Sequence, residues 1–149
     1  MTRGGLLLLL FAWCPVALAG PTIADAVDPT APCLKYDDSS VTLSGTVFTR
    51  IYFGPPNYGE HPESDGRDTA VLLLLDAPIC VVGSSHREGD NNSPEHNQIL
   101  VQLAAVSISF ATLQKAIGQR ATVRGSLFSA ITGHHRTPVL MDVHDVRVP

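Results

Sequence analysis

The stretch VTLSGTVFTRIYF, residues 41–53, decides the fold class. Val41, Leu43 and Val47 stand on one side of it, and polar residues fill most of the positions between them. An alternation with a period of two is typical of a β-strand that buries one face. Gly45, in the middle of the run, predicts a bulge or a sharp bend. A long, bent strand at this point indicates a mainly β fold.

Four later segments also have the pattern of strands, and polar loops rich in Gly, Pro, Asn and Asp separate them. These expected strands are residues 69–82, 98–106, 120–131 and 138–148. One helix is expected over residues 110–117, because Ser109 can cap it and Gly118 can end it. Leu113 and Ile117 would lie on its apolar face with Phe110.

The order of three strands, one helix and two strands is that of an OB-fold, a small five-stranded Greek-key barrel. The short helix then lies between strands three and four. Residues 41–51 and 121–131 align without a gap, with Gly45 and Gly125 at the same place in each. A duplication would explain this similarity. Alternatively, both strands need a glycine in the middle so that the sheet can coil. An SH3-like barrel is the competing fold, but it leaves the helix unexplained. We expect the OB-like barrel to comprise residues 38–149.

The N-terminus has the features of a secretory signal peptide over residues 1–19. Arg3 is followed by the apolar run LLLLLFA, and Ala17 and Ala19 form a small-x-small cleavage signal. We therefore expect cleavage after Ala19 and a secreted or periplasmic protein with no membrane span once the signal is removed. The following residues 20–37 are rich in Pro and Ala without periodicity, and we expect a flexible N-terminal segment.

Loss of the leader also removes Cys14 and leaves Cys33 and Cys80 as the remaining cysteines. In an oxidising compartment two cysteines favour a disulfide, here closing a loop of about 48 residues that is worth about 4 kcal/mol. In the expected hairpin, the start of strand one lies near the end of strand two, so Cys33 can reach Cys80. Free thiols or a redox pair are the other interpretations.

The charge of the chain argues against one class of ligand. Without Arg3, nine basic residues face fourteen acidic ones, for a net charge of about −5. An acidic domain without basic runs is a poor candidate for binding phosphate backbones, so we do not expect nucleic acid as a partner.

Several motifs resemble a family of short secreted bacterial proteins that is catalogued as a domain of unknown function. They are GPPNY (residues 54–58), DAPICV (76–81), LQKAIGQRATVRGSLFSA (113–130) and TGHHRTPVL (132–140). The resemblance extends over roughly residues 41–146 and implies a secreted domain without a known activity. Family members often carry a third histidine where this chain has Arg136, a departure that puts an obligatory three-histidine metal site in doubt.

The histidine turn admits a metal-binding interpretation. His134 and His135 with His144 would supply three ligands, which is the minimum for a zinc site. Adjacent residues of an extended strand point to opposite faces, so both turn histidines can bind one ion only if the turn bends sharply. Catalysis has less support. Ser126 and Ser129 lie near the histidines, but no G-x-S-x-G elbow is present, so the sequence favours a non-enzymatic protein without a cofactor.

Binding of a ligand through two loops is the leading hypothesis. In an OB-fold, the loop between strands one and two and the loop between strands four and five flank one binding face. Here the first loop and its flanks carry aromatic rings, and the second carries the histidine turn. The candidate contact residues are Arg50, Tyr52, Phe53, Tyr58, His134, His135 and Arg136. We expect an unidentified protein or cell-envelope glycan as ligand, with the two arginines pairing an anion. Alternatively, Phe53 and Tyr58 cover the mouth of the barrel.

Overall fold

The computed structural model describes residues 32–36, 40–83 and 94–149. The expected signal peptide, residues 1–19, lies outside the described residues, and so do residues 20–31 of the expected flexible segment. Among the described residues, no helix is both long enough and apolar enough to span a membrane.

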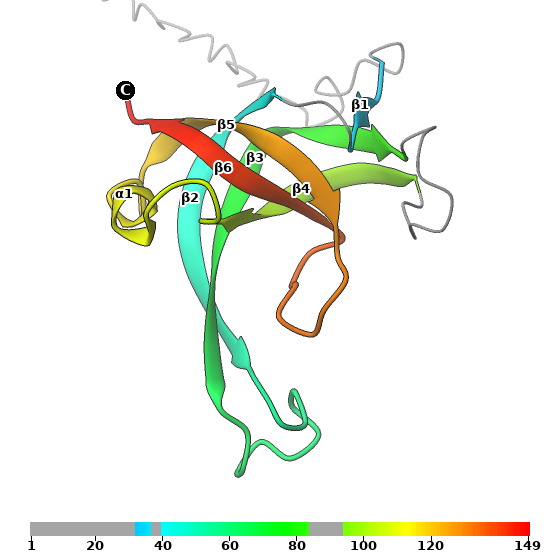
Figure 1. The fold of residues 1–149 in the computed structure, drawn as a ribbon, viewed down its shortest axis with the longest axis vertical. Helices are drawn as coiled ribbons and strands as arrows, with labels where there is room; N and C mark the ends of the chain where they lie inside the picture. Colours follow the sequence, from blue (N-terminus) through cyan, green and yellow to red (C-terminus); the bar gives the residue numbers. More distant parts are fainter. Residues whose placement is uncertain (1–31, 37–39, 84–93) are drawn as a thin grey trace, which may run out of the picture.

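The described chain is mainly β, and five of its strands close into a barrel (Figure 1). The elements are β1 (Leu34–Lys35), β2 (Val41–Phe53), β3 (Arg67–Val82), β4 (Glu95–Ala104), α1 (Phe110–Gln114), β5 (Arg120–Ser129) and β6 (Val139–Arg147). Around the barrel the order is β3, β2, β5, β6 and β4, and β4 pairs back onto β3. The pairing of β4 with β6 is parallel, and the other barrel pairings are antiparallel. The predicted five-stranded Greek-key barrel is therefore confirmed, with α1 between its third and fourth strands.

The interior of the barrel is filled by alternate side chains of all five strands. Fully buried residues include Val47, Leu73, Val101, Val123 and Met141, one from each strand. Removal of this apolar surface from water is the main stabilising contribution to a fold of this kind. The period-two pattern that predicted the strands is the pattern of inward-facing residues.

Two mid-strand glycines allow the strands to bend tightly against their neighbours. A Cβ atom at Gly45 would overlap the carbonyl oxygen of Leu74 in β3. A Cβ atom at Gly125 would overlap the carbonyl oxygen of Asp142 in β6. The close approach of a neighbouring strand therefore requires glycine at both positions. The pairings of β2 run through Gly45 without a register shift, whereas the pairing of β5 with β6 shifts register between Arg124 and Gly125.

The helix is shorter than the sequence predicts. Ser109 caps it, since its Oγ accepts a hydrogen bond from the N–H of Thr112 at 3.2 Å. Leu113 is fully buried in the core, whereas Phe110 is exposed. The helix ends at residue 114, and turns continue the chain to Gly118, whose φ is +81°.

The strand β1 was not expected, and it extends the sheet before the predicted domain boundary at residue 38. It pairs in parallel with the end of β3, where Leu34 lies opposite Val81. The predicted disulfide is confirmed: Cys33 is bonded to Cys80, with the two Cα atoms 4.8 Å apart. Tyr36 packs into the hydrophobic core. Residues 33–36 are therefore tied to the barrel.

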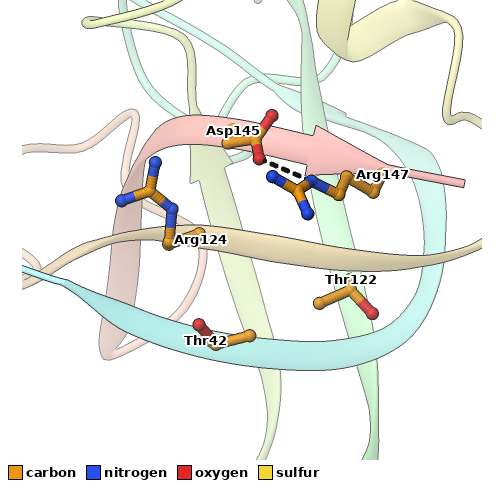
Figure 2. A pocket seen from close by; sticks show the side chains of 5 residues that line it. All are labelled: Thr42, Thr122, Arg124, Asp145 and Arg147. Atoms are coloured by element: carbon orange, nitrogen blue, oxygen red, sulfur yellow. Dashed lines mark hydrogen bonds and ion pairs between the residues drawn. The ribbon is translucent and has the colours of Figure 1, made fainter.

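The outer face of β2, β5 and β6 carries a small depression of about 130 Å³ (Figure 2). Its lining residues are Thr42, Thr122, Arg124, Asp145 and Arg147. The Nε–H of Arg147 donates a hydrogen bond to the carboxylate of Asp145 at 2.9 Å. None of these side chains belongs to the binding loops that the sequence singles out.

Candidate ligand-binding site

The two loops that the sequence singles out meet at one end of the barrel. The hairpin of β2 and β3 extends beyond the barrel, and the β5–β6 loop, residues 130–138, lies beside it (Figure 1). A Cβ atom at Gly133 would lie only 2.8 Å from Cζ of Tyr58, so the tyrosine ring lies directly against this glycine. The loops are in contact rather than on opposite sides of an open cleft.

Backbone hydrogen bonds fix the position of Tyr58 in the β2–β3 loop. The carboxylate of Asp65 accepts the N–H groups of Asn57 at 2.8 Å and Gly59 at 2.6 Å. Desolvation raises the pKa of Asp65, but these backbone donors outweigh it and hold the pKa below its usual value. Tyr58 itself has a φ of +55°, which is uncommon for a residue with a side chain.

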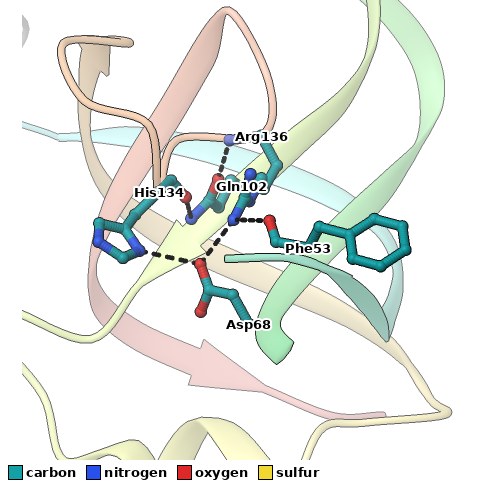
Figure 3. A network of polar contacts seen from close by, with 5 residues as sticks. All are labelled: Phe53, Asp68, Gln102, His134 and Arg136. Atoms are coloured by element: carbon teal, nitrogen blue, oxygen red, sulfur yellow. Dashed lines mark hydrogen bonds and ion pairs between the residues drawn. The ribbon is translucent and has the colours of Figure 1, made fainter. Parts of the chain in front are cut away.

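Arg136 is the centre of the contact between the loops (Figure 3). One of its terminal nitrogens, Nη2, donates to a carboxylate oxygen of Asp68 at 2.8 Å and to the carbonyl oxygen of Phe53 at 3.0 Å. Its guanidinium carbon lies 5.0 Å from the ring centroid of Tyr52 and 5.7 Å from that of Tyr58. Only 10% of the Arg136 side chain is exposed. Such a charge is stable at this depth because a carboxylate and two aromatic rings surround it.

Gln102 of β4 attaches the β5–β6 loop to the barrel. Its side-chain oxygen accepts the N–H of Arg136, and its Nε2 donates to the carbonyl oxygen of His134 at 3.2 Å (Figure 3). Its backbone N–H donates to Oγ1 of Thr137 at 3.0 Å. Every polar group of the Gln102 side chain is thus used to hold the loop.

Two leucines are buried beside Gln102 on the outer face of the barrel. Leu72 and Leu140 are the cross-strand neighbours of Gln102 in β3 and β6, and neighbours in register share a face. Both leucines are buried, although neither belongs to the interior core cluster. Gln102, which bonds the β5–β6 loop, therefore lies on the same face as these two leucines.

The two histidines of the turn have different surroundings. Nδ1 of His134 lies 3.0 Å from the Asp68 carboxylate. Hydrogen bonds from His134 and then Arg136 lower the pKa of Asp68. His135 turns inward: its Nδ1 accepts the N–H of Ile131 at 2.9 Å, and its ring meets Phe128 edge-on at 5.6 Å. Burial, and then the neighbouring His134, lower the pKa of His135.

The structure brings together four of the seven candidate contact residues, and it adds two that the sequence did not identify. We call this contact the loop clasp, and it consists of Tyr52, Tyr58, Asp68, Gln102, His134 and Arg136. Asp68 was missed although it lies directly opposite Tyr52 in the hairpin. Gln102 was missed because no sequence signal connects β4 with the turn.

The other three candidate residues lie around the loop clasp. Arg50 is exposed, and its guanidinium carbon is 5.3 Å from the ring centroid of Tyr52. The guanidinium carbon of Arg67 lies 4.0 Å from the ring centroid of Phe53, and the ring also lies against Gly59 of its own loop. His135 is half-buried beneath the turn. Since Asp68 already neutralises Arg136, the expected pairing of Arg136 with a ligand anion has no support in this geometry.

The three histidines of the metal-binding interpretation do not converge. His134 bonds Asp68, His135 accepts from Ile131, and Nε2 of His144 lies 3.7 Å from the Asp142 carboxylate. Across residues 32–36, 40–83 and 94–149, just one group brings three ligand atoms within 4.8 Å of one another, namely Cys33, Cys80 and His96. The histidine turn therefore has no metal-site geometry.

A protein-family model described as a domain of unknown function (DUF4431) matches residues 100–147. This match confirms the resemblance to a family of unknown function for the part of the chain from the middle of β4 to the end of β6. The matched segment contains Gln102 and the whole β5–β6 loop but not the β2–β3 hairpin. No curated protein and no solved structure matches the chain.

Proposed function

We propose that this protein is a secreted or periplasmic, non-enzymatic binding module that contacts its ligand with the β2–β3 and β5–β6 loops. The ligand is a protein or a cell-envelope glycan. The observation that carries the proposal is the loop clasp, which holds two loops far apart in sequence as one surface. A surface that is already ordered loses less conformational entropy when it binds a ligand.

The side chains that remain accessible at the loop clasp suit such a ligand. Tyr58 is 42% exposed, and its ring meets the ring of His134 edge-on at 5.9 Å. Tyrosine combines a large apolar face with a polar tip, which is why it is frequent in binding surfaces for proteins and sugars. Arg50 adds an exposed charge on the same hairpin. We assign ligand contact to Tyr58, His134 and Arg50, and a positioning role to Arg136.

The charge of the chain supports this choice of ligand class. The formal net charge is −4, so a polyanion such as nucleic acid would be repelled by the domain as a whole. At the loop clasp, the charge of Arg136 is balanced by Asp68. Neutral sugars or a protein surface meet no such electrostatic cost.

The test compares Tyr58→Ala and His134→Ala with His61→Ala, which alters an exposed histidine of the same hairpin loop. Binding is measured against envelope glycan fractions and against secreted and envelope proteins of the source cell. We expect the first two variants to weaken binding at least about tenfold with unchanged thermal stability, since exposed aromatic anchors dominate interfaces. Full binding by both variants would reject the proposed surface.

A subtler variant tests the position of Tyr58 without removing its ring. In Gly133→Ala the new methyl group lies 2.8 Å from Cζ of Tyr58, so the ring must rotate away. We expect weaker binding and little loss of stability, because the displaced group is the end of a flexible side chain. The matched control is Gly66→Ala, whose methyl group meets nothing closer than 3.4 Å.

A further inference from the structure

The disulfide lies beside a histidine that neither the fold nor the loop clasp requires. The ligand-type atoms of Cys33, Cys80 and His96 all lie within 4.8 Å of one another. Cys33 directly precedes β1, Cys80 belongs to β3 and His96 belongs to β4. Segments from three parts of the chain therefore converge on one point. This point lies beside β1, at the other end of the barrel from the β5–β6 loop with its histidine turn (Figure 1).

A β-bulge places His96 at this point. In the pairing of β3 with β4, Ile79 lies opposite Gln98 and Val81 lies opposite Glu95. Cys80 alone therefore faces two residues of β4, His96 and Asn97. Asn97 has a φ of +54°, a conformation that few residues with a side chain adopt. Bulges of this kind redirect a side chain, and here the redirected side chain is the histidine beside the disulfide.

We propose that reduction of the Cys33–Cys80 bond converts this point into a metal site for a zinc-like divalent cation. The ligands are the two cysteine thiolates and the imidazole of His96. A dithiol reductant supplies two electrons and two protons to the S–S bond and leaves as a disulfide. Each cysteine thiol then releases its proton when it binds the cation, so the two thiolates balance the double positive charge.

The geometry fits this ligand set with small movements. Zinc binds sulfur at about 2.3 Å and nitrogen at about 2.0 Å, which places tetrahedral ligand atoms about 3.5 Å apart. The three ligand atoms start within 4.8 Å, so rotation of side chains brings them to that spacing. The cation would join β1 to β3 in place of the covalent bond. Three protein ligands leave a fourth position for water or another ligand.

Both the reductant and the cation can reach the site. The two cysteines are half-buried, and His96 is exposed. Disulfides that solvent reaches are the ones that exchange readily with external thiols. This inference does not depend on the loop clasp or on the proposed binding function.

The experiment uses the full chain with Cys14→Ser, so that Cys33 and Cys80 are the only thiols after reduction. A phosphine reductant, which takes its oxygen from water and leaves no competing thiol, opens the bond. Cobalt(II), a spectroscopic substitute for zinc, is then titrated into the oxidised and the reduced protein. We expect one cobalt per reduced chain with a thiolate-to-cobalt charge-transfer absorption, and no such absorption from the oxidised chain.

Three variants assign the ligands. Cys33→Ser and Cys80→Ser should each reduce the charge-transfer absorption, and His96→Ala should weaken cobalt binding at least about tenfold, as loss of even an outer partner does. The control His61→Ala should bind as the parent does. Equal binding by the oxidised chain, no binding by the reduced chain, or unchanged affinity in His96→Ala would each overturn the proposal. If reduction unfolds the chain, zinc must restore its folded circular-dichroism spectrum, and failure to do so also overturns it.

Discussion

The close backbone contacts at Gly45 and Gly125 and the contacts of the loop clasp both join segments that are far apart in the sequence, but they do so by different means. At the two glycines, backbone lies against backbone, and no space remains for a single methyl group. At the loop clasp, long side chains with partial access to water make the contacts. The first kind of contact has one possible geometry, and the second can rearrange.

This difference separates residues that determine folding from residues that present a binding surface. A backbone contact inside a sheet cannot relax without breaking several hydrogen bonds, so its loss affects the whole barrel. Polar side-chain contacts at the end of a hairpin can break while the barrel remains folded. We therefore expect changes at the glycines to act on the stability of the barrel and changes at the exposed residues of the loop clasp to act mainly on binding. Loss of the buried pair of Arg136 and Asp68 should affect stability as well.

The largest effect is expected for Gly45→Ala and Gly125→Ala. Each new methyl group would overlap a carbonyl oxygen of the adjacent strand, of Leu74 or Asp142. Because these neighbours are backbone atoms, we expect each variant to lose about 3 kcal/mol of unfolding free energy. Urea unfolding followed by circular dichroism measures this loss. Gly66→Ala, in the hairpin loop, should change the same quantity by less than about 0.5 kcal/mol, and a large loss there would show that steric overlap is not the cause.

An intermediate effect is expected for Asp68→Asn. The substitution leaves the guanidinium of Arg136, which is 10% exposed, without its counter-charge. Breaking a fully buried pair costs several kcal/mol, but Asp68 is 31% exposed, so we expect a loss of about 2 kcal/mol. The control is Asp76→Asn, which breaks the more exposed pair with Arg120 and should cost much less than Asp68→Asn does. Equal losses of stability in the two variants would show that the burial of Arg136 does not increase the cost of removing its counter-charge.

The sequence predicted the barrel because its signals are local and repeated. Val41, Leu43 and Val47 alternate with polar residues, and each is buried as that pattern requires. The cysteine pairing followed from the geometry of a hairpin. Ser109 was identified as a cap because a helix start has a short-range chemical requirement.

The partners within the loop clasp could not be predicted in the same way. Asp68 meets Arg136 only because of the register of β2 against β3 and the path of the β5–β6 loop. Gln102 depends on the parallel pairing of β4 with β6, which no neighbouring residue in the sequence signals. The strand β1 has two residues and no periodicity of its own, so the pairing with β3 alone defines it.

The smallest effect is expected for the pH dependence that His135 confers on the loop clasp. Burial, and then His134, lower the pKa of His135, so the folded chain takes up this proton less readily than the unfolded chain does. The contribution of His135 to the free energy of unfolding is therefore fully present above about pH 6.5, the usual pKa of histidine. It is lost as the pH falls below that value. Protonation at Nδ1 removes the acceptor for the N–H of Ile131. Asp68, whose pKa is also lowered, adds to the decline only at a lower pH, near the usual range of a carboxyl.

Replacement of His135 by asparagine separates this contribution from the others. The asparagine side chain does not titrate and still offers an oxygen that can accept the N–H of Ile131. The melting temperature of the parent chain and of each variant is compared between about pH 7.5 and about pH 5. His135→Asn should flatten the decline, whereas His61→Asn, an exposed site in the other loop, should not. An unchanged slope in His135→Asn would show that the hydrogen bond between His135 and Ile131 does not make the stability of the β5–β6 loop depend on pH.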